Sequence, residues 1–297
     1  MRIVVGVTDD AGADDAVAFA VLWARAASSS LVVAHVMPRP WPSHNQGMVD
    51  AEWVTYLREQ ASVALDRARA HIPADLAAEY VTDQHPSSGR GLAEVASKHD
   101  GRLVVIGSSA SGHTGNIGIG TTSDQLLHGG TTPVTVVPEG YAARGVPALE
   151  RISVAYEHSV DSDVALVAMR QVAERTKLPV RLLTLVQYPP RFLPGAGQML
   201  DTIRADARLW LEQARASVPD ASAEIAEGEE VGDALGSVDW LRGECLLVGS
   251  AEYGPVKRVF LGDTATRILR ASTVPVTVLP RDVEPELEST TAIPRVR

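Results

Sequence analysis

Residues 103–138 read LVVIGSSASGHTGNIGIGTTSDQLLHGGTTPVTVVP, and they define one compact structural unit. An apolar run, Leu103–Ile106, ends at a glycine, and a loop of small residues with four further glycines follows. The segment Thr121–Asp124 opens a short predicted helix, Gln125–His128, and a second apolar run, Pro133–Val137, closes the unit. The order strand, glycine-rich loop, helix, strand is one of the few arrangements that present backbone N–H groups to an anion.

The same unit occurs again in residues 246–280, LLVGSAEYGPVKRVFLGDTATRILRASTVPVTVLP. Landmark glycines and prolines of the first unit recur 142 positions later without a gap. The pairs are Gly107 with Gly249, Gly120 with Gly262, Pro133 with Pro275, and Pro138 with Pro280. Chance rarely preserves one spacing over four such landmarks, so we interpret the chain as a tandem duplication.

Composition narrows the class of protein. The 297 residues suffice for two domains, and 45% hydrophobic residues allow each half a core. A net charge of −10 argues against nucleic-acid binding and against docking on an anionic membrane. The single cysteine, Cys245, lies in an apolar run and is interpreted as a buried strand residue in preference to a reactive thiol. No signal-peptide pattern or membrane-length apolar segment occurs, so we expect a soluble cytoplasmic protein.

Strands and helices alternate through the first half. Predicted strands are Ile3–Val7, Leu31–Met37 and Ala78–Thr82, and predicted helices are Ala13–Ala27, Ala51–His71 with Asp50 as its cap, and Gly91–His99. The second half repeats the order, with strands Ile152–Tyr156, Val180–Val186 and Ser222–Ala226 and helices Asp161–Thr176, Met199–Ser217 and Asp233–Leu241. Such alternation predicts an α/β fold with a parallel sheet and helices on both faces.

These patterns divide the chain into two doubly wound domains. We expect domain 1 at residues 1–140, a linker at 141–150, domain 2 at 151–281, and a disordered tail at 282–297. The tail prediction rests on its Pro and Glu content and on the lack of an apolar period.

Three features make the whole chain resemble a tandem universal stress protein. They are the opening strand-turn-helix, Arg2–Ala20 and Arg151–Val167; the strand ending His35-Val36 before a proline-rich connection; and the glycine loop leading to Pro133–Val136 and Pro275–Val278. The resemblance implies a five-stranded parallel sheet of order 3-2-1-4-5 in each half, with the ligand cleft at its switch point. It also implies that the edge strands Pro133–Val137 and Pro275–Leu279 pair inside the chain, and that a homodimer of chains is plausible.

ATP-binding members of that family carry G-x-x-G, nine residues, then G-S/T. In the first half this pattern falls on Gly107, Ala110, Gly120 and Thr121, and only Ala110 departs from it. In the second half it falls on Gly249, Glu252, Gly262 and Asp263, and only the glycines fit. The resemblance therefore implies ATP, with Mg²⁺, or another adenine nucleotide in the first cleft. The residues it implies are Thr8, Asp9, Val36, Gly107, Ala110, Gly120, Thr121 and Thr122.

The departures weaken the two clefts to different degrees. Ala110 costs about 1 kcal/mol if the loop needs left-handed geometry there. In the second half, Asp263 is expected to cap its own helix and Glu252 to add a negative charge, with Glu157 in the place of Thr8. We therefore expect a degenerate second cleft.

Catalysis has little support. The eight histidines show no metal-ligand spacing, G-x-S-x-G is absent, and only Asp9, Asp10 or His113 could serve as a base. His35 is interpreted as a core residue, and Trp23, Trp53, Trp210 and Trp240 as helix packing residues. The sequence leaves two main functions open: a nucleotide-binding stress protein, or a nucleotide-independent interaction protein with vestigial clefts. A slow ATPase or another small-molecule enzyme is the third and least favoured reading.

Overall fold

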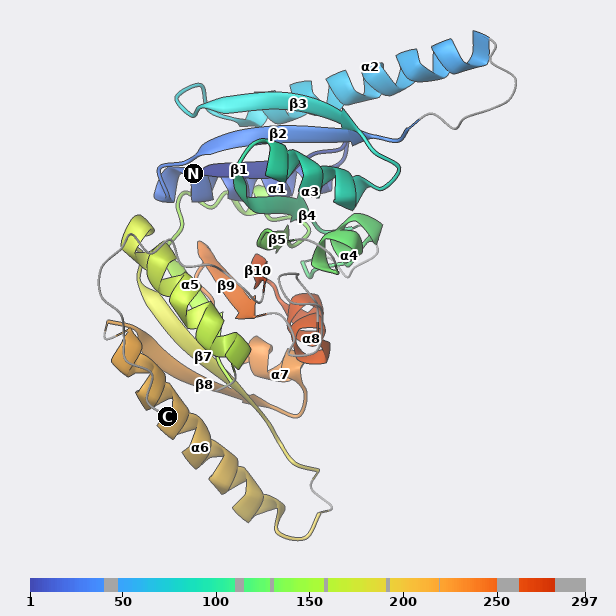
Figure 1. The fold of residues 1–297 in the computed structure, drawn as a ribbon. Helices are drawn as coiled ribbons and strands as arrows, with labels where there is room; N and C mark the ends of the chain where they lie inside the picture. The colour runs from blue at the N-terminus through green and yellow to red at the C-terminus, as the bar shows by residue number, and fades with distance from the viewer. Residues whose placement is uncertain are drawn as a thin grey trace, which may run out of the picture.

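The computed structural model describes residues 1–39, 48–109, 115–128, 131–157, 160–190, 193–218, 220–249 and 262–280, with backbone alone at 48–50 and 160–164. Its described strands form a single sheet between two layers of helices (Figure 1). No helix within these ranges is long and apolar enough to cross a membrane.

The sheet has ten strands in the order β3-β2-β1-β4-β5-β10-β9-β6-β7-β8. The strands of the first half are β1 (Arg2–Gly6), β2 (Ser30–Met37), β3 (Ala78–Gln84), β4 (Gly101–Gly107) and β5 (Val134–Val137). Those of the second half are β6 (Arg151–Ala155), β7 (Val180–Gln187), β8 (Ser222–Gly228), β9 (Glu244–Gly249) and β10 (Val276–Leu279). Pairing within each half is parallel, so the predicted order 3-2-1-4-5 is confirmed in both halves.

Helices cover both faces of the sheet. Those of the first half are α1 (Ala11–Ala26), α2 (Met48–His71), α3 (Ser88–Lys98) and α4 (Thr121–Leu127), and those of the second are α5 (Val160–Thr176), α6 (Ala196–Ser217), α7 (Val231–Gly236) and α8 (Asp263–Ala271). One apolar cluster joins α1, α2, α5 and α6 to the side chains of Ile3 and Ile152, and another joins α3, α4, α7 and α8 to Val4 and Leu246. Each cluster runs through both halves.

The two halves meet at β5 and β10, which pair antiparallel at the centre of the sheet (Figure 1). Thr135 lies opposite Thr277, and these residues occupy equivalent positions in the two repeats. Their Oγ1 atoms are 2.8 Å apart. The approximate two-fold axis that relates the halves therefore passes between them, and the predicted internal pairing of the edge strands is confirmed.

Several predicted boundaries were wrong. α2 begins at Met48, so Asp50 lies inside the helix and is not its cap. α7 ends at Gly236 instead of continuing to Leu241, because a glycine weakens a helix and the chain leaves it there. Trp240 consequently lies beyond the helix, and Trp53 on α2 is 47% exposed, so neither is a buried helix packing residue.

The linker between the halves packs against α1. Tyr141 is buried and meets the ring of Phe19 edge-on at 5.9 Å, and a short 3₁₀ turn, Ala142–Arg144, follows. The buried carboxylate of Asp15 accepts hydrogen bonds from the backbone N–H groups of Gly140 and Ala142 at 2.8 and 2.7 Å. Burial raises the pKa of Asp15, and the two N–H donors oppose that rise. Asp15 therefore anchors the linker to α1.

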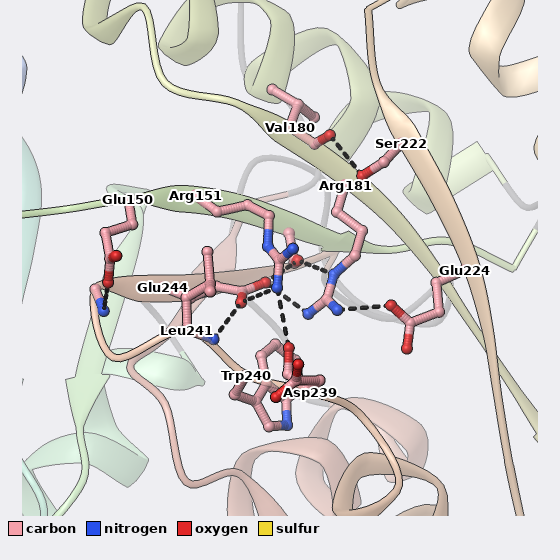
Figure 2. Close-up of polar contacts among 12 residues, drawn as sticks. Glu150, Arg151, Val180, Arg181, Ser222, Glu224, Asp239, Trp240, Leu241 and Glu244 are labelled. Carbon is pink, nitrogen blue, oxygen red and sulfur yellow. Dashed lines mark hydrogen bonds and ion pairs between the residues drawn. The ribbon is translucent and has the colours of Figure 1, made fainter.

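The second half contains a buried ionic network that the sequence analysis missed (Figure 2). The Arg181 guanidinium on β7 lies 2.6 Å from Glu244 Oε1 on β9 and 2.7 Å from Glu224 Oε2 on β8. Arg151 on β6 adds a second guanidinium 2.7 Å from Glu244 Oε2. Ser153 donates to Glu244 and accepts from Arg181 Nε, so the network joins four neighbouring strands.

The network occupies space that apolar side chains fill in the first half. Val4 and Val32 stand where Ser153 and Arg181 stand, and both valines are buried. α3 has 11 residues and covers this end of the first half, whereas α7 has only 6. In the second half the ring of Trp240 provides the cover, with the Arg181 guanidinium 4.9 Å from its centroid.

We predict that Glu244→Gln lowers the free energy of unfolding by about 3–5 kcal/mol, because it removes the buried negative charge that the Arg181 and Arg151 guanidinium groups share. Glu224→Gln is the matched control, since it faces the same Arg181 but its side chain is 38% exposed. The control is expected to cost less than about 1 kcal/mol. Urea denaturation followed by circular dichroism measures both, and equal losses would contradict the assignment.

Candidate functional site

The predicted cleft of the first half lies where β4 meets the start of α1. A methyl group added to Gly107 would lie only 2.0 Å from the carbonyl oxygen of Gly12, and one added to Gly12 would lie 2.9 Å from Ser108 O. Two backbones therefore touch at this point, and only glycine permits it. This contact brings the loop after β4 against the amino end of α1 at the carboxyl edge of the sheet.

Backbone and hydroxyl groups hold the described part of the glycine-rich loop. Ser108 N donates to Val137 O at 2.8 Å, and Ser108 Oγ accepts from Gly118 N at 2.6 Å. Ser109 N donates to Gly118 O at 3.0 Å. These hydrogen bonds hold the two ends of the loop together. The predicted site residue Ala110 and the histidine His113 lie outside the described residues.

α4 begins directly after this loop, with Gly120 as its cap residue and no side-chain cap hydrogen bond. Gly120 N donates to Ser123 Oγ at 2.8 Å, so the glycine N–H is occupied. The first N–H groups inside a helix have no acceptor in that helix. Thr121, the first helical residue, is exposed at this end.

Thr122 has a structural contact in addition to its predicted site role. Its hydroxyl lies 2.6 Å from Ser88 Oγ at the start of α3. Gln125 extends the same contact, since its Oε1 accepts from Ser87 Oγ at 2.6 Å. The amino ends of α3 and α4 are therefore joined, which sets the direction in which α4 points.

The end of β1 carries Thr8, Asp9 and Asp10. Thr8 Oγ1 donates to Asp10 Oδ2 at 2.6 Å, and Asp10 Oδ1 caps α1 by accepting from Ala13 N at 2.9 Å. Asp9 is 3.0 Å from an Nη1 atom of Arg67, whose other nitrogens bind Asp14 at 2.7 and 2.9 Å. The hydrogen bonds that Arg67 donates to Asp14 and Asp9 raise the pKa of Arg67.

The end of β2 closes this side of the cleft. His35 Nδ1 lies 2.9 Å from the carbonyl oxygen of Val7, so the neutral ring donates its Nδ1–H to that acceptor. Burial lowers the pKa of His35, and the hydrogen bond to Val7 opposes that lowering. Val36 is half-buried beside Gly91, where an added methyl group would lie 2.6 Å from Val36 Cγ1.

The second cleft differs in charge. Gly262 caps α8 without a side-chain hydrogen bond, and Asp263 is the first helical residue and is exposed. The expectation that Asp263 caps its own helix is therefore wrong, because the cap lies one residue earlier. Its carboxylate instead adds negative charge at the position that Thr121 occupies in the first half. Glu252 lies outside the described residues.

Sequence reasoning identified the residues of the loop motif but missed their supports. Gly12, Ser108 and Arg67 each position part of the cleft, and none belongs to the motif. A glycine directly after the Asp9-Asp10 turn was a usable signal for Gly12. No local pattern indicates Arg67, because it lies 58 residues from Asp9.

Comparison with known proteins agrees with this geometry. The model of the Universal stress protein family matches residues 1–138 and again 148–280. The chain belongs to the universal stress protein family. A universal stress protein of Mycobacterium tuberculosis is 32% identical over 292 residues, covering 94% of this chain and 100% of the relative, and one of Mycobacterium bovis matches equally well.

Solved structures share the tandem fold. A universal stress protein from Archaeoglobus fulgidus matches with a TM-score of 0.68 at 19% identity, covering 95% of this chain and 98% of that one. A putative universal stress protein from Pseudomonas aeruginosa matches with a TM-score of 0.55 at 13% identity, covering 94% and 93%. At these identities the likeness concerns the fold alone.

We predict that Gly107→Ala destabilises this universal stress protein by about 3 kcal/mol, because its methyl group has to displace the backbone of Gly12. Gly236→Ala is the control, since nothing lies within 4 Å of the added methyl group there. The control is expected to be neutral or to gain up to about 1 kcal/mol from higher helix propensity. Thermal and urea denaturation compare the two variants, and a neutral Gly107→Ala would contradict the close contact.

We also predict a pH dependence of stability that arises from His35. Its pKa in the folded state lies below the ordinary value of 6.5, so the unfolded chain binds the proton more tightly. The stabilisation is complete above pH 6.5 and is lost as pH falls through 6.5 toward the folded-state pKa. Urea denaturation between pH 5 and 8 should show a shallower pH slope for His35→Gln than for the parent chain, and an unchanged slope would refute this.

Proposed function

We propose that the first cleft binds an adenine nucleotide, ATP with Mg²⁺, and that the protein acts as a nucleotide-binding stress protein. The observation that carries the proposal is the glycine-capped start of α4 beside the carboxyl end of β4. α1 and α3 are capped by Asp10 and Ser87, whereas α4 has no side-chain cap. A helix end without a side-chain cap, at the switch point of a parallel sheet, suits phosphate oxygens.

The remaining residues suit the other end of a nucleotide. With the phosphates near Thr121, the nucleoside extends toward the ends of β1 and β2, where Thr8 and Val36 lie. Thr8 offers a hydroxyl where ATP-binding members usually carry an aspartate, and Asp9 follows it. Family membership supports this assignment, because binding of adenine nucleotides is frequent in universal stress proteins.

The proposed role is binding and not catalysis. Asp10 caps α1 and accepts from Thr8, and Asp9 is paired with Arg67. Both carboxylates therefore already have hydrogen-bonding partners. Neither is available as a general base without breaking a contact that supports the cleft.

The second cleft is proposed as a weak site or a structural remnant. Asp263 adds a negative charge at the helix end where phosphate would bind. Like charges in a partly desolvated cleft repel by an amount on the order of kcal/mol each. The expected stoichiometry is therefore one nucleotide per chain.

A nucleotide-independent interaction protein is the second candidate. One observation favours it: the rings of Trp53 and Tyr56 stack 5.5 Å apart on α2, and both are about half exposed. α2 extends beyond the sheet at this end (Figure 1). Exposed aromatic pairs are common at protein–protein contacts.

The deciding experiment is to denature the purified protein and quantify released nucleotide by chromatography and mass spectrometry, followed by calorimetry with Mg-ATP. One nucleotide per chain supports the proposal. Two per chain would contradict the charge argument for the second cleft. No released nucleotide and no heat of binding would favour the interaction protein.

We predict that Thr121→Asp, which copies the second cleft into the first, weakens Mg-ATP binding by about tenfold or more through charge repulsion. Asp263→Thr is the reciprocal change and should strengthen binding in the second cleft. Gln213→Glu is the control, since it adds the same charge on the exposed surface of α6. Calorimetry measures all three, and equal affinities of Thr121→Asp and the control would exclude phosphate from α4.

A further inference from the structure

A cavity of about 1090 Å³ lies between the two halves, away from the nucleotide cleft. It opens at the amino ends of β1 and β4, whereas the proposed nucleotide site lies at their carboxyl ends. The apolar part of its lining includes Trp23, Leu103, Ala168, Val172 and Leu279. We call this cavity the inter-half groove.

The approximate two-fold axis relates this groove to a place that the linker fills. There the ring of Tyr141 meets Phe19 at 5.9 Å. Arg144 Nη1 donates to Thr273 O at 2.6 Å. Glu150 N donates to Gly243 O at 2.6 Å, just before the chain enters β6. The linker thus contacts Phe19, Thr273 and Gly243, which are three separate points.

The equivalents of all three points line the inter-half groove. The equivalents of β1 and α1 in the second half, β6 and α5, lie 149 positions later in the sequence. Ser28 and Lys177, which both have a left-handed backbone, show the same spacing. Phe19 therefore corresponds to Ala168. At the spacing of 142, Thr273 corresponds to Thr131 and Gly243 to Gly101. Ala168, Thr131 and Gly101 all border the groove. The groove is therefore the second copy of the linker's binding place.

We infer that the inter-half groove is the docking site of the chain's own C-terminal segment, residues 281–297, which lies outside the described residues. This segment follows Pro280, and Pro280 itself lines the groove. It is the continuation of repeat 2 that corresponds to the linker after repeat 1. Its 17 residues exceed the 10 of the linker, residues 141–150, so its length suffices.

Sequence chemistry supports this occupant. Val283 corresponds to Tyr141, and Leu287 follows four positions later, so the segment carries two apolar residues that match the apolar part of the groove lining. Residues 281–288, RDVEPELE, carry one positive and four negative charges. The groove offers Arg2, Arg102 and Arg175 against Asp100 and Glu174. An acidic segment with apolar anchors complements that lining.

Amide hydrogen exchange of the full chain, measured by mass spectrometry, tests the inference. The reference is a synthetic peptide of residues 281–297. Exchange in residues 281–292 is expected to be about tenfold or more slower in the chain than in the peptide. Exchange at the free-peptide rate throughout would overturn the inference. The measurement is repeated at several protein concentrations, and protection that grows with concentration would assign the segment to a second copy.

A variant pair on α5 localises the docking site. Ala168→Arg places a long side chain in the groove. Val167→Arg is the control, because it changes the preceding residue, whose side chain is 40% exposed. The protection is expected to disappear in Ala168→Arg and to persist in Val167→Arg. Protection that survives in both would place the segment elsewhere and overturn the inference. Circular dichroism checks that each variant is folded. The comparison of the unmodified chain with the peptide does not depend on the variants.

Discussion

The antiparallel pairing of β5 with β10 is the contact on which the whole molecule depends. Only three residue pairs make it, centred on Thr135 and Thr277. The pairing satisfies two edges that would otherwise present unpaired backbone groups. It also makes both helical layers continuous, so Tyr141 of the linker packs in the same cluster as Phe19 and Ile152. One short contact thereby turns two repeats into a single sheet.

Within that shared frame the halves have diverged. The first half closes the amino end of its sheet with Val4 and Val32, and the second uses Arg181 and Glu244 beneath Trp240. A buried ion network is seldom a gain in stability over apolar packing, so its presence reflects the short α7 and the space that it leaves. The divergence at the predicted clefts is smaller. Thr121 is the first residue of α4, and Asp263 is the first residue of the equivalent helix α8.

The alternation of strands and helices was predictable because apolar runs are separated by turns that contain glycine and proline, and four such landmarks recur 142 positions later. The strand order 3-2-1-4-5 came from the resemblance to the family. The family motif likewise identified Gly107 and Gly120. That assignment was incomplete, because the close backbone contact with Gly12 also requires a glycine at position 107. The ionic network was not predictable, since Arg181 and Glu244 are 63 residues apart and each resembles an ordinary surface charge in its own segment. Trp240 was misassigned for the same reason, because a helix boundary depends on what packs beyond it.

Local patterns in the chain specify the repeat, the alternation of strand and helix, and the glycine-capped loops, because these depend on backbone geometry and on the spacing of apolar residues. Tertiary structure alone decides which charges are buried, which carboxylates already have partners, and which of two equivalent grooves the linker fills. Those properties arise from residues that are distant in sequence. Asp9 with Arg67, and Asp15 with the linker, become pairs only when helices and strands are packed together.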